Sequence, residues 1–129
     1  MYTTTMVQGV DPEFISAIVA SEMRRNAAFR ENLERRRQAL RAEAQRLAPL
    51  LLGCDPGITR IRLIGSVLPN RRFRSDSDLD IVVEGATQFS QLLRIADESE
   101  WPVDLIEWET LHPAIRDVVA RDAEVLYAS

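Results

Sequence analysis

The sequence has very little of the side-chain chemistry on which many sites are built. Its 129 residues include one cysteine, Cys54, and one histidine, His112, so neither an internal disulfide nor a metal site of clustered histidines or cysteines can form within one chain. Lysine is absent, and all sixteen basic residues are arginine. No apolar run approaches the ~20 residues that a membrane-spanning helix needs. The N-terminus shows no basic segment followed by an apolar one, so we expect a cytoplasmic protein in a reducing compartment.

What the chain does contain is typical of one globular domain with a helical appendage. Apolar residues make up 46% and charged residues 28%, which excludes collagen-like, low-complexity and wholly disordered chains. The net charge of −4 is unevenly spread, because residues 51–75 carry five arginines and one acid whereas residues 76–129 carry three arginines and thirteen acids. The acidic balance makes direct nucleic-acid binding an unfavoured function. A basic segment followed by an acidic one favours metal and polyphosphate chemistry.

Residues 11–52 form the first predicted element. Asp11 can cap a helix, Pro12 suits the first helical position, and no glycine follows until Gly53. Apolar residues recur in steps of three and four, which predicts one amphipathic helix or a pair of helices that would break at Ser21–Asn26. The arginines of this segment are interpreted as a solvated polar face, and they are Arg24, Arg25, Arg35, Arg36 and Arg37.

The hydrophobic period changes from 3.6 to 2 after the helix-breaking cluster Gly53–Gly57. Short alternating runs then predict strands, and two apolar-periodic segments predict helices, the first capped by Thr87. This order predicts an α+β fold with a small mixed sheet, divided into an N-terminal helical extension over 1–57 and a domain over 58–129. The predicted strands are 60–65, 78–83 and 102–106, the helices are 87–96 and 113–121, and 124–127 is a last strand or a docking tail.

Two carboxylates in the second predicted strand need an explanation. Side chains alternate between the faces of a strand, so Asp78 and Asp80 are expected on one side, ~7 Å apart along the backbone. Leu79 points to the other side, toward a core. Two carboxylates on one face repel each other, and a divalent cation with hard oxygen ligands, such as Mg²⁺, would neutralise them. The alternative is an exposed edge strand with a polar face.

The surroundings of this acidic pair favour the metal interpretation. Gly65 and Ser66 end the preceding strand, where a glycine lets the backbone approach a phosphate and the serine supplies N–H and hydroxyl donors, although a plain turn explains them too. A third carboxylate, Asp104, lies within an apolar run and would join the pair if the third strand lies beside the second. The connecting loop adds Arg71, Arg72 and Arg74, which would meet phosphate charge or simply face solvent.

Together these residues resemble the nucleotidyltransferase superfamily, and its minimal members in particular. The resemblance is carried by Gly65-Ser66, by Ser77-Asp78-Leu79-Asp80 twelve residues later, and by Asp104, and it extends over residues 58–127. Minimal members often act as antitoxins of HEPN-type toxins. Where many of them have a second glycine, four residues after the serine, this chain has Asn70, a residue that tolerates left-handed backbone geometry.

The resemblance implies an α+β nucleotidyltransferase sheet with packed helices, an enzyme, and roles for named residues. Gly65, Ser66, Ser77 and Arg74 would bind the nucleotide. Asp78 and Asp80 would ligate two Mg²⁺ ions, and Asp104 would ligate one of them and help to activate the attacking hydroxyl. The implied reaction moves AMP from ATP to a hydroxyl, and the implied acceptor is a tyrosine of a cognate HEPN-type toxin, which this AMPylation would silence.

Two other functions stay open at this point. The protein could neutralise a partner by binding alone, through the helical region 11–52, which could equally join two copies of the chain. It could instead modify a small molecule of the aminoglycoside type, although such enzymes usually add a second domain for the acceptor.

Overall fold

The structure is a computed structural model that describes residues 11–129, so the first ten residues of the predicted extension lie outside the described part. Helices and strands follow in the predicted α+β order. The elements are α2 (Pro12–Cys54), β1 (Arg60–Ile64), β2 (Leu79–Glu84), α3 (Phe89–Asp97), β3 (Val103–Glu107), the 3₁₀ turn η1 (Trp108–Thr110), α4 (Pro113–Asp122) and β4 (Glu124–Ala128).

Residues 12–54 form one helix, α2, and the alternative of two helices broken at Ser21–Asn26 is wrong. That stretch contains neither glycine nor proline, so its polar residues cost the helix little. Asp11 acts as the predicted cap, because its Oδ1 accepts the Glu13 N–H at 2.9 Å. The helix runs two residues further than predicted and ends at Cys54, directly before the turn that contains Pro56.

The chain divides into two units, one that ends at Glu34 and one of residues Arg35–Ser129. In the described part of the first unit, most large apolar side chains of the helix are exposed. The sequence division at residue 57 stays a prediction. The second unit includes the last twenty residues of α2, because these contribute buried side chains to its core, namely Leu40, Ala44, Leu47, Ala48 and Leu51.

The sheet has the strand order β3-β2-β1-β4 and is mixed, as predicted. β1 pairs antiparallel with β2 and with β4, whereas β2 and β3 are parallel. The segment Glu124–Ala128 is therefore a strand rather than a docking tail. The parallel pair aligns Asp80 with Asp104, and the antiparallel pair aligns Ile64 with Asp80, so these three positions form one row across the sheet.

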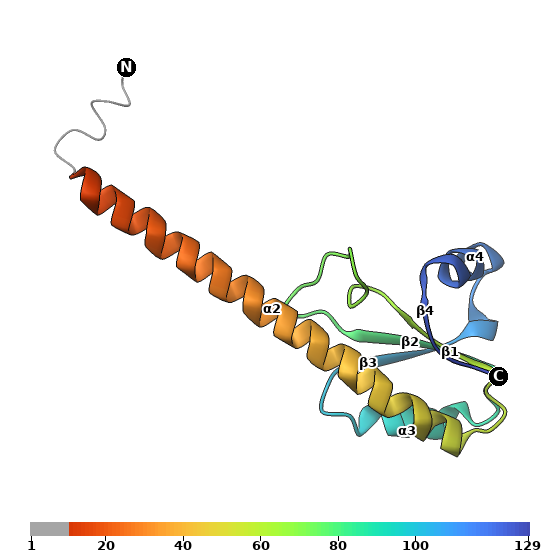
Figure 1. The fold of residues 1–129 in the computed structure, drawn as a ribbon. Helices are drawn as coiled ribbons and strands as arrows, with labels where there is room; N and C mark the ends of the chain where they lie inside the picture. Colours follow the sequence, from red (N-terminus) through yellow and green to blue (C-terminus); the bar gives the residue numbers. More distant parts are fainter. Residues whose placement is uncertain (1–10) are drawn as a thin grey trace. The chain divides into compact units, whose positions relative to one another are not determined.

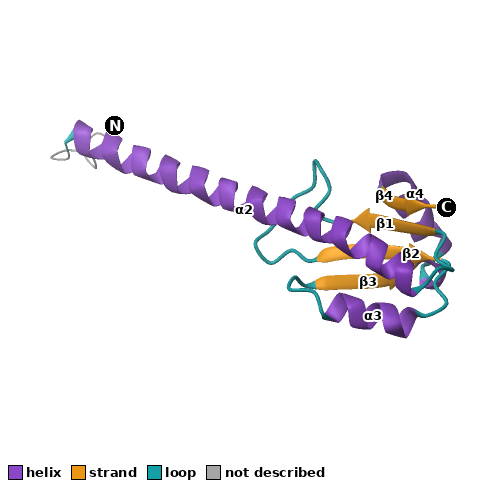
Figure 2. Cartoon of the chain, turned by 60° about the horizontal axis from the view of Figure 1, so that its bottom comes forward, coloured by secondary structure: helices purple, strands orange, loops and turns teal. Residues whose placement is uncertain are grey.

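One face of the sheet is covered and the other carries the site. Leu63, Ile81 and Leu105 form a row on the covered face and pack into the core with the second half of α2 and with Leu92 of α3. Figures 1 and 2 show α3 on this side of the sheet and α4 on the opposite side. Because side chains alternate along a strand, Asp80 points to the face opposite Ile81.

Helix α3 begins differently from its prediction. Thr87 does not cap it; Gln88 holds the cap position and makes no side-chain cap bond. The buried carboxylate of Asp55, in the turn after α2, accepts the backbone N–H groups of Thr87 and Gln88 at 2.7 and 2.8 Å. The cap therefore comes from a residue more than thirty positions earlier. No helix among residues 11–129 combines the length and the apolar character that crossing a membrane requires.

Candidate functional site

The structure places two of the three candidate carboxylates side by side. Asp80 and Asp104 are direct partners in the parallel pairing of β2 and β3, and both point to the face opposite the core. Asp104 is exposed and Asp80 is partly buried. Asp78 is one residue short of β2 and is exposed. The sheet register thus confirms the expectation that the third predicted strand lies beside the second, and it brings Asp104 beside Asp80. The predicted start of the second strand at Asp78 is one residue too early.

The three acids influence one another electrostatically. Burial, the Asp104 charge and the Asp78 charge together raise the pKa of Asp80 from 3.8 to about 6. Asp78 and Asp104 also line one cavity of about 390 Å³ at the β3 end of the site, with Trp101 on its wall. Crowded carboxylates of this kind repel one another, and the repulsion is relieved by a proton or by a bound cation.

The donor set of this site fits a hard divalent cation. Carboxylate oxygens are the ligands that Mg²⁺ and Ca²⁺ take, and neither His112 nor Cys54 lines the cavity beside these acids to favour zinc. Among residues 11–129, no three acidic, histidine or cysteine side chains already lie close enough together to hold a metal ion. Of the three candidate carboxylates, the sheet register pairs only Asp80 and Asp104 directly.

Gly65 lies directly against the acids. Its φ of +87° belongs to the left-handed region, and a Cβ atom added here would lie 2.5 Å from Asp80 Oδ2. Only glycine fits this position without strain. The Gly65 carbonyl accepts the Leu68 N–H at 3.2 Å, which closes a turn around the partly buried Ser66. The absence of a side chain at Gly65 therefore lets the backbone lie directly against the Asp80 carboxylate.

The other two nucleotide-binding candidates lie at the far end of the loop that follows. Ser77 Oγ accepts the Arg74 backbone N–H at 2.9 Å, and the Ser77 N–H donates to the Arg74 carbonyl at 3.1 Å. The Ser77 hydroxyl thus shapes the turn before Asp78. The Arg74 side chain is exposed. Asn70 has a φ of +64°, so its backbone adopts the left-handed geometry that a glycine at this position would allow.

Sequence reasoning missed residues that hold this loop at both ends. Arg36 donates to the Ser77 carbonyl at 3.3 Å, and Arg37 donates to the Val67 carbonyl at 2.9 Å. Arg36 also stacks over the Trp101 ring, 5.3 Å from its centroid. For these two residues the interpretation as a solvated helix face is wrong. Apart from their position on α2, no local pattern indicates these bonds. The carbonyl groups that Arg36 and Arg37 bind are 41 and 30 residues away in the sequence.

Comparisons with known proteins agree on the fold. No protein-family model and no curated protein matches this chain. Among solved structures, a mutant MntA–HpeT toxin–antitoxin matches with a TM-score of 0.53 and 21% identity, and a toxin–antitoxin with AMP-PNP matches with 0.53 and 23%; each match covers 66% of this chain and 73% of the other.

A third match is a tri-AMPylated Shewanella oneidensis HEPN toxin in complex with an MNT antitoxin. Its TM-score is 0.51 at 20% identity, over 70% of this chain and 73% of the other. The chain therefore has the α+β fold of these minimal nucleotidyltransferase antitoxins, which is the fold that the sequence motifs predicted.

Proposed function

We propose that the protein is a Mg²⁺-dependent nucleotidyltransferase that moves AMP from ATP to a hydroxyl group, with a tyrosine of a HEPN-type toxin as the acceptor. The observation that carries the proposal is Asp80, which pairs with Asp104 across the sheet, feels the charges of Asp104 and Asp78, and lies directly against the Gly65 backbone. The matched structures add support, because one contains AMP-PNP and another contains an AMPylated toxin beside its antitoxin.

Each residue has a defined part in this reaction. The backbone of Gly65 and the hydroxyl of Ser66 would hold the β- and γ-phosphates. The acceptor oxygen attacks the α-phosphorus, the bond from that phosphorus to the bridging oxygen breaks, and pyrophosphate leaves. Asp104, an exposed carboxylate that pairs with Asp80, would accept the proton of the attacking hydroxyl. When bound to the three carboxylates, two Mg²⁺ ions supply charge neutralisation for the attacking and leaving oxygens.

The direct test is transfer of label from α-labelled ATP. The protein is incubated with Mg²⁺ and a HEPN-type toxin, and the position of the label is read by mass spectrometry. We expect AMP on a tyrosine, and we expect Asp78→Asn plus Asp80→Asn to abolish it. Asp76→Asn is the matched control, since Asp76 is an exposed acid two residues before Asp78. Folded protein that transfers no label under these conditions contradicts the proposal.

One observation favours a second function, neutralisation by binding alone. The described part of the first unit is a helix with large exposed apolar residues, including Phe14, Ile18, Met23 and Phe29. A solvent-exposed apolar face is typical of a surface that a protein partner covers. If binding suffices, the Asp78→Asn plus Asp80→Asn variant still neutralises the toxin. If this variant still binds the toxin and no longer neutralises it, binding alone is excluded.

A further inference from the structure

Two neighbouring arginines of α2 hold the ends of the loop that joins β1 to β2. Arg37 Nε donates to the Val67 carbonyl at 2.9 Å, and Arg36 donates to the Ser77 carbonyl at 3.3 Å. These contacts lie within the second unit of the chain, Arg35–Ser129. A hydrogen bond from a charged guanidinium group is stronger than one between neutral groups. The helix therefore restrains the separation between the two ends of the loop.

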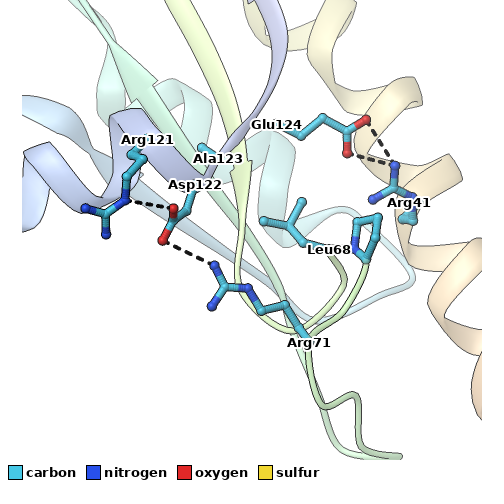
Figure 3. A pocket seen from close by; sticks show the side chains of 8 residues that line it. Arg41, Leu68, Arg71, Arg121, Asp122, Ala123 and Glu124 are labelled. Carbon is cyan, nitrogen blue, oxygen red and sulfur yellow. Dashed lines mark hydrogen bonds and ion pairs between the residues drawn. The ribbon is translucent and has the colours of Figure 1, made fainter.

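The bond from Arg37 lies at the end of the loop that carries the proposed phosphate donors. Val67 directly follows Ser66 and is completely buried, so the position of its carbonyl also determines where the Ser66 hydroxyl can lie. Arg41 donates to the same carbonyl at 3.4 Å. Arg41 is in turn held by Glu124 of β4, which accepts a bond from its Nη2 at 3.0 Å (Figure 3). Two arginines of α2 thus meet at one backbone oxygen beside Ser66.

The bond from Arg36 lies at the opposite end of the loop, beside a proposed metal ligand. Its acceptor is the carbonyl of the peptide bond that joins Ser77 to Asp78. The Arg36 guanidinium also lies over the Trp101 ring, and Trp101 lines the cavity that contains Asp78 and Asp104. Stacking on an aromatic face restricts a guanidinium group, so Arg36 presents its N–H groups to this peptide in one orientation.

The middle of the loop is largely exposed. The residues from Pro69 to Asp76 face solvent, apart from the partly buried Phe73, which packs against the core. Arg71 reaches Asp122 of α4 at 3.4 Å, at the surface, where an ion pair contributes little (Figure 3). The geometry of the loop therefore depends chiefly on its two ends and on the arginines that hold them.

We propose that Arg36 and Arg37 are positioning residues of the transfer reaction. Arg37 places the Ser66 hydroxyl for the nucleotide phosphates. Arg36 places Asp78 for the metal ion. Each arginine acts through a backbone carbonyl rather than on the reacting atoms. The inference rests on the proposed function for the roles of Ser66 and Asp78, and it adds that α2 sets the distance between them. Catalysis is sensitive to that distance, because a displacement of about 1 Å can cost about a hundredfold in rate.

The test separates the two ends of the loop by the kinetics of label transfer from α-labelled ATP. Arg37→Met should raise the KM for ATP by about tenfold and leave kcat within about twofold, because a phosphate site binds the ground state and the transition state alike. Arg36→Met should raise the Mg²⁺ concentration that gives half the maximal rate by about tenfold, and it should leave the KM for ATP at saturating Mg²⁺ unchanged.

Two further variants separate positioning from stability. Arg37→Lys keeps the charge and a donor, so it should fold like the wild type and show a smaller rise of the same kind in the KM for ATP. Arg46→Met is the matched control, because Arg46 lies on the same helix and donates to the buried Glu43 instead of the loop. This control should lower the free energy of unfolding and change neither the KM for ATP nor the Mg²⁺ requirement.

A second measurement, amide hydrogen exchange, needs neither nucleotide nor toxin. The N–H groups of Leu68 and Ser77 donate hydrogen bonds at the two ends of the loop. Arg37→Met should remove the protection of the Leu68 amide, Arg36→Met should remove that of the Ser77 amide, and Arg46→Met should affect neither.

Unchanged protection, or lost protection with unchanged KM and Mg²⁺ requirement, would overturn the positioning roles while the proposed function stands. Equal kinetic effects of Arg36→Met, Arg37→Met and Arg46→Met would overturn them too, because stability alone would then explain the losses. A wild-type protein that neither binds Mg²⁺-ATP in calorimetry nor transfers label would overturn the proposed function and the positioning roles together.

Discussion

Two aspartates of this protein have opposite surroundings. Asp55 is completely buried in the turn after α2, and Asp80 is partly buried on the sheet face that points away from Ile81 and the core. Burial raises the pKa of Asp55, but bonds from the Gln88 and Thr87 backbone, the Thr87 hydroxyl and the Gly57 N–H outweigh it and hold the pKa below 3.8. Burial also raises the pKa of Asp80, and there the neighbouring acids raise it further.

The difference is the one expected between a structural carboxylate, Asp55, and the functional one that we propose, Asp80. The donors around Asp55 stabilise its charge, so this residue holds the α2–β1 turn to the start of α3. The acids around Asp80 destabilise its negative charge. Such an unfavourable arrangement is typical of a site at which a bound ligand compensates the charge. Replacement of Asp55 should therefore destabilise the fold, whereas replacement of Asp80 should impair function and leave the fold intact.

The largest effect is expected for catalysis in Asp80→Asn. The amide keeps the shape of the side chain and removes the charge on which cation binding depends. Label transfer should fall by about a thousandfold or more, which corresponds to ~4 kcal/mol of transition-state stabilisation. The measurement is the initial rate of transfer from α-labelled ATP at saturating Mg²⁺. A rate within tenfold of the wild-type rate would show that Asp80 does not bind a catalytic metal ion.

The next largest effect is on stability, in Asp55→Ala. The change removes a buried carboxylate that accepts the N–H groups of Thr87 and Gln88, so the free energy of unfolding should fall by about 3 kcal/mol or more. Urea denaturation followed by circular dichroism measures it. Asp76→Ala, which removes an exposed acid, should stay within about 0.5 kcal/mol. A loss below about 1 kcal/mol in Asp55→Ala would refute the structural role.

A pair of glycines gives the third comparison. Gly65→Ala places a Cβ atom against Asp80 Oδ2 at a φ of +87°, so we expect a loss of about 2 kcal/mol in stability together with weaker Mg²⁺-ATP binding. Gly53→Ala, in the last turn of α2, meets nothing within 4 Å and should stabilise the protein by about 0.5–1 kcal/mol. Thermal unfolding and calorimetry check both. Similar effects in the two variants would mean that contact with Asp80 is unimportant.

The pH dependence of stability distinguishes the two aspartates by sign. Because the pKa of Asp80 is raised from 3.8 to about 6 in the folded protein, the two states differ in protonation between these pH values. In this range Asp80 is largely protonated in the folded protein and largely ionised in the unfolded chain. Through this window the free energy of unfolding therefore falls as pH rises, by about 1 kcal/mol after allowance for solvent screening. Metal-free Asp80→Asn should lack this fall, and Mg²⁺ at pH 7 should stabilise the wild-type protein alone. The contribution of Asp55 has the opposite sign, since it is present above pH 3.8 and lost below.

The same two residues show how far the sequence can predict this molecule. The motif around Asp80 is local, with Gly65 before it and alternating apolar residues beside it, so its strand and its face could be predicted from period and spacing. Its pairing with Asp104 depended on which strands are neighbours, and the sheet register decides that. Asp55 stands in a turn rich in glycine and proline, where an acid is ordinary. Its partners are more than thirty residues later, and no local pattern encodes such a contact.

The other differences between prediction and structure have the same origin. Thr87 carries the correct residue type for a helix cap, but its hydroxyl and its N–H both donate to Asp55. Arg36 and Arg37 belong to a charged run that a solvated helix would also show, and only the folded chain brings carbonyl groups from the loop to them. Periodicity reports which face of an element is buried, whereas the partner of a polar side chain is decided by tertiary packing.

The smallest effect is expected at Asn70, the position where members of the family that the motif resembles often have glycine. The residue already has a φ of +64°, so the turn does not require glycine, and the remaining cost is the strain of a Cβ atom in the left-handed region. Asn70→Gly should therefore change the free energy of unfolding by less than about 1 kcal/mol, because relief of strain is offset by the greater freedom of the unfolded chain. Label transfer should stay within about twofold. A large gain in transfer rate would instead show that this asparagine restrains the phosphate loop, and it would make the contrast between Asp55 and Asp80 insufficient to explain activity.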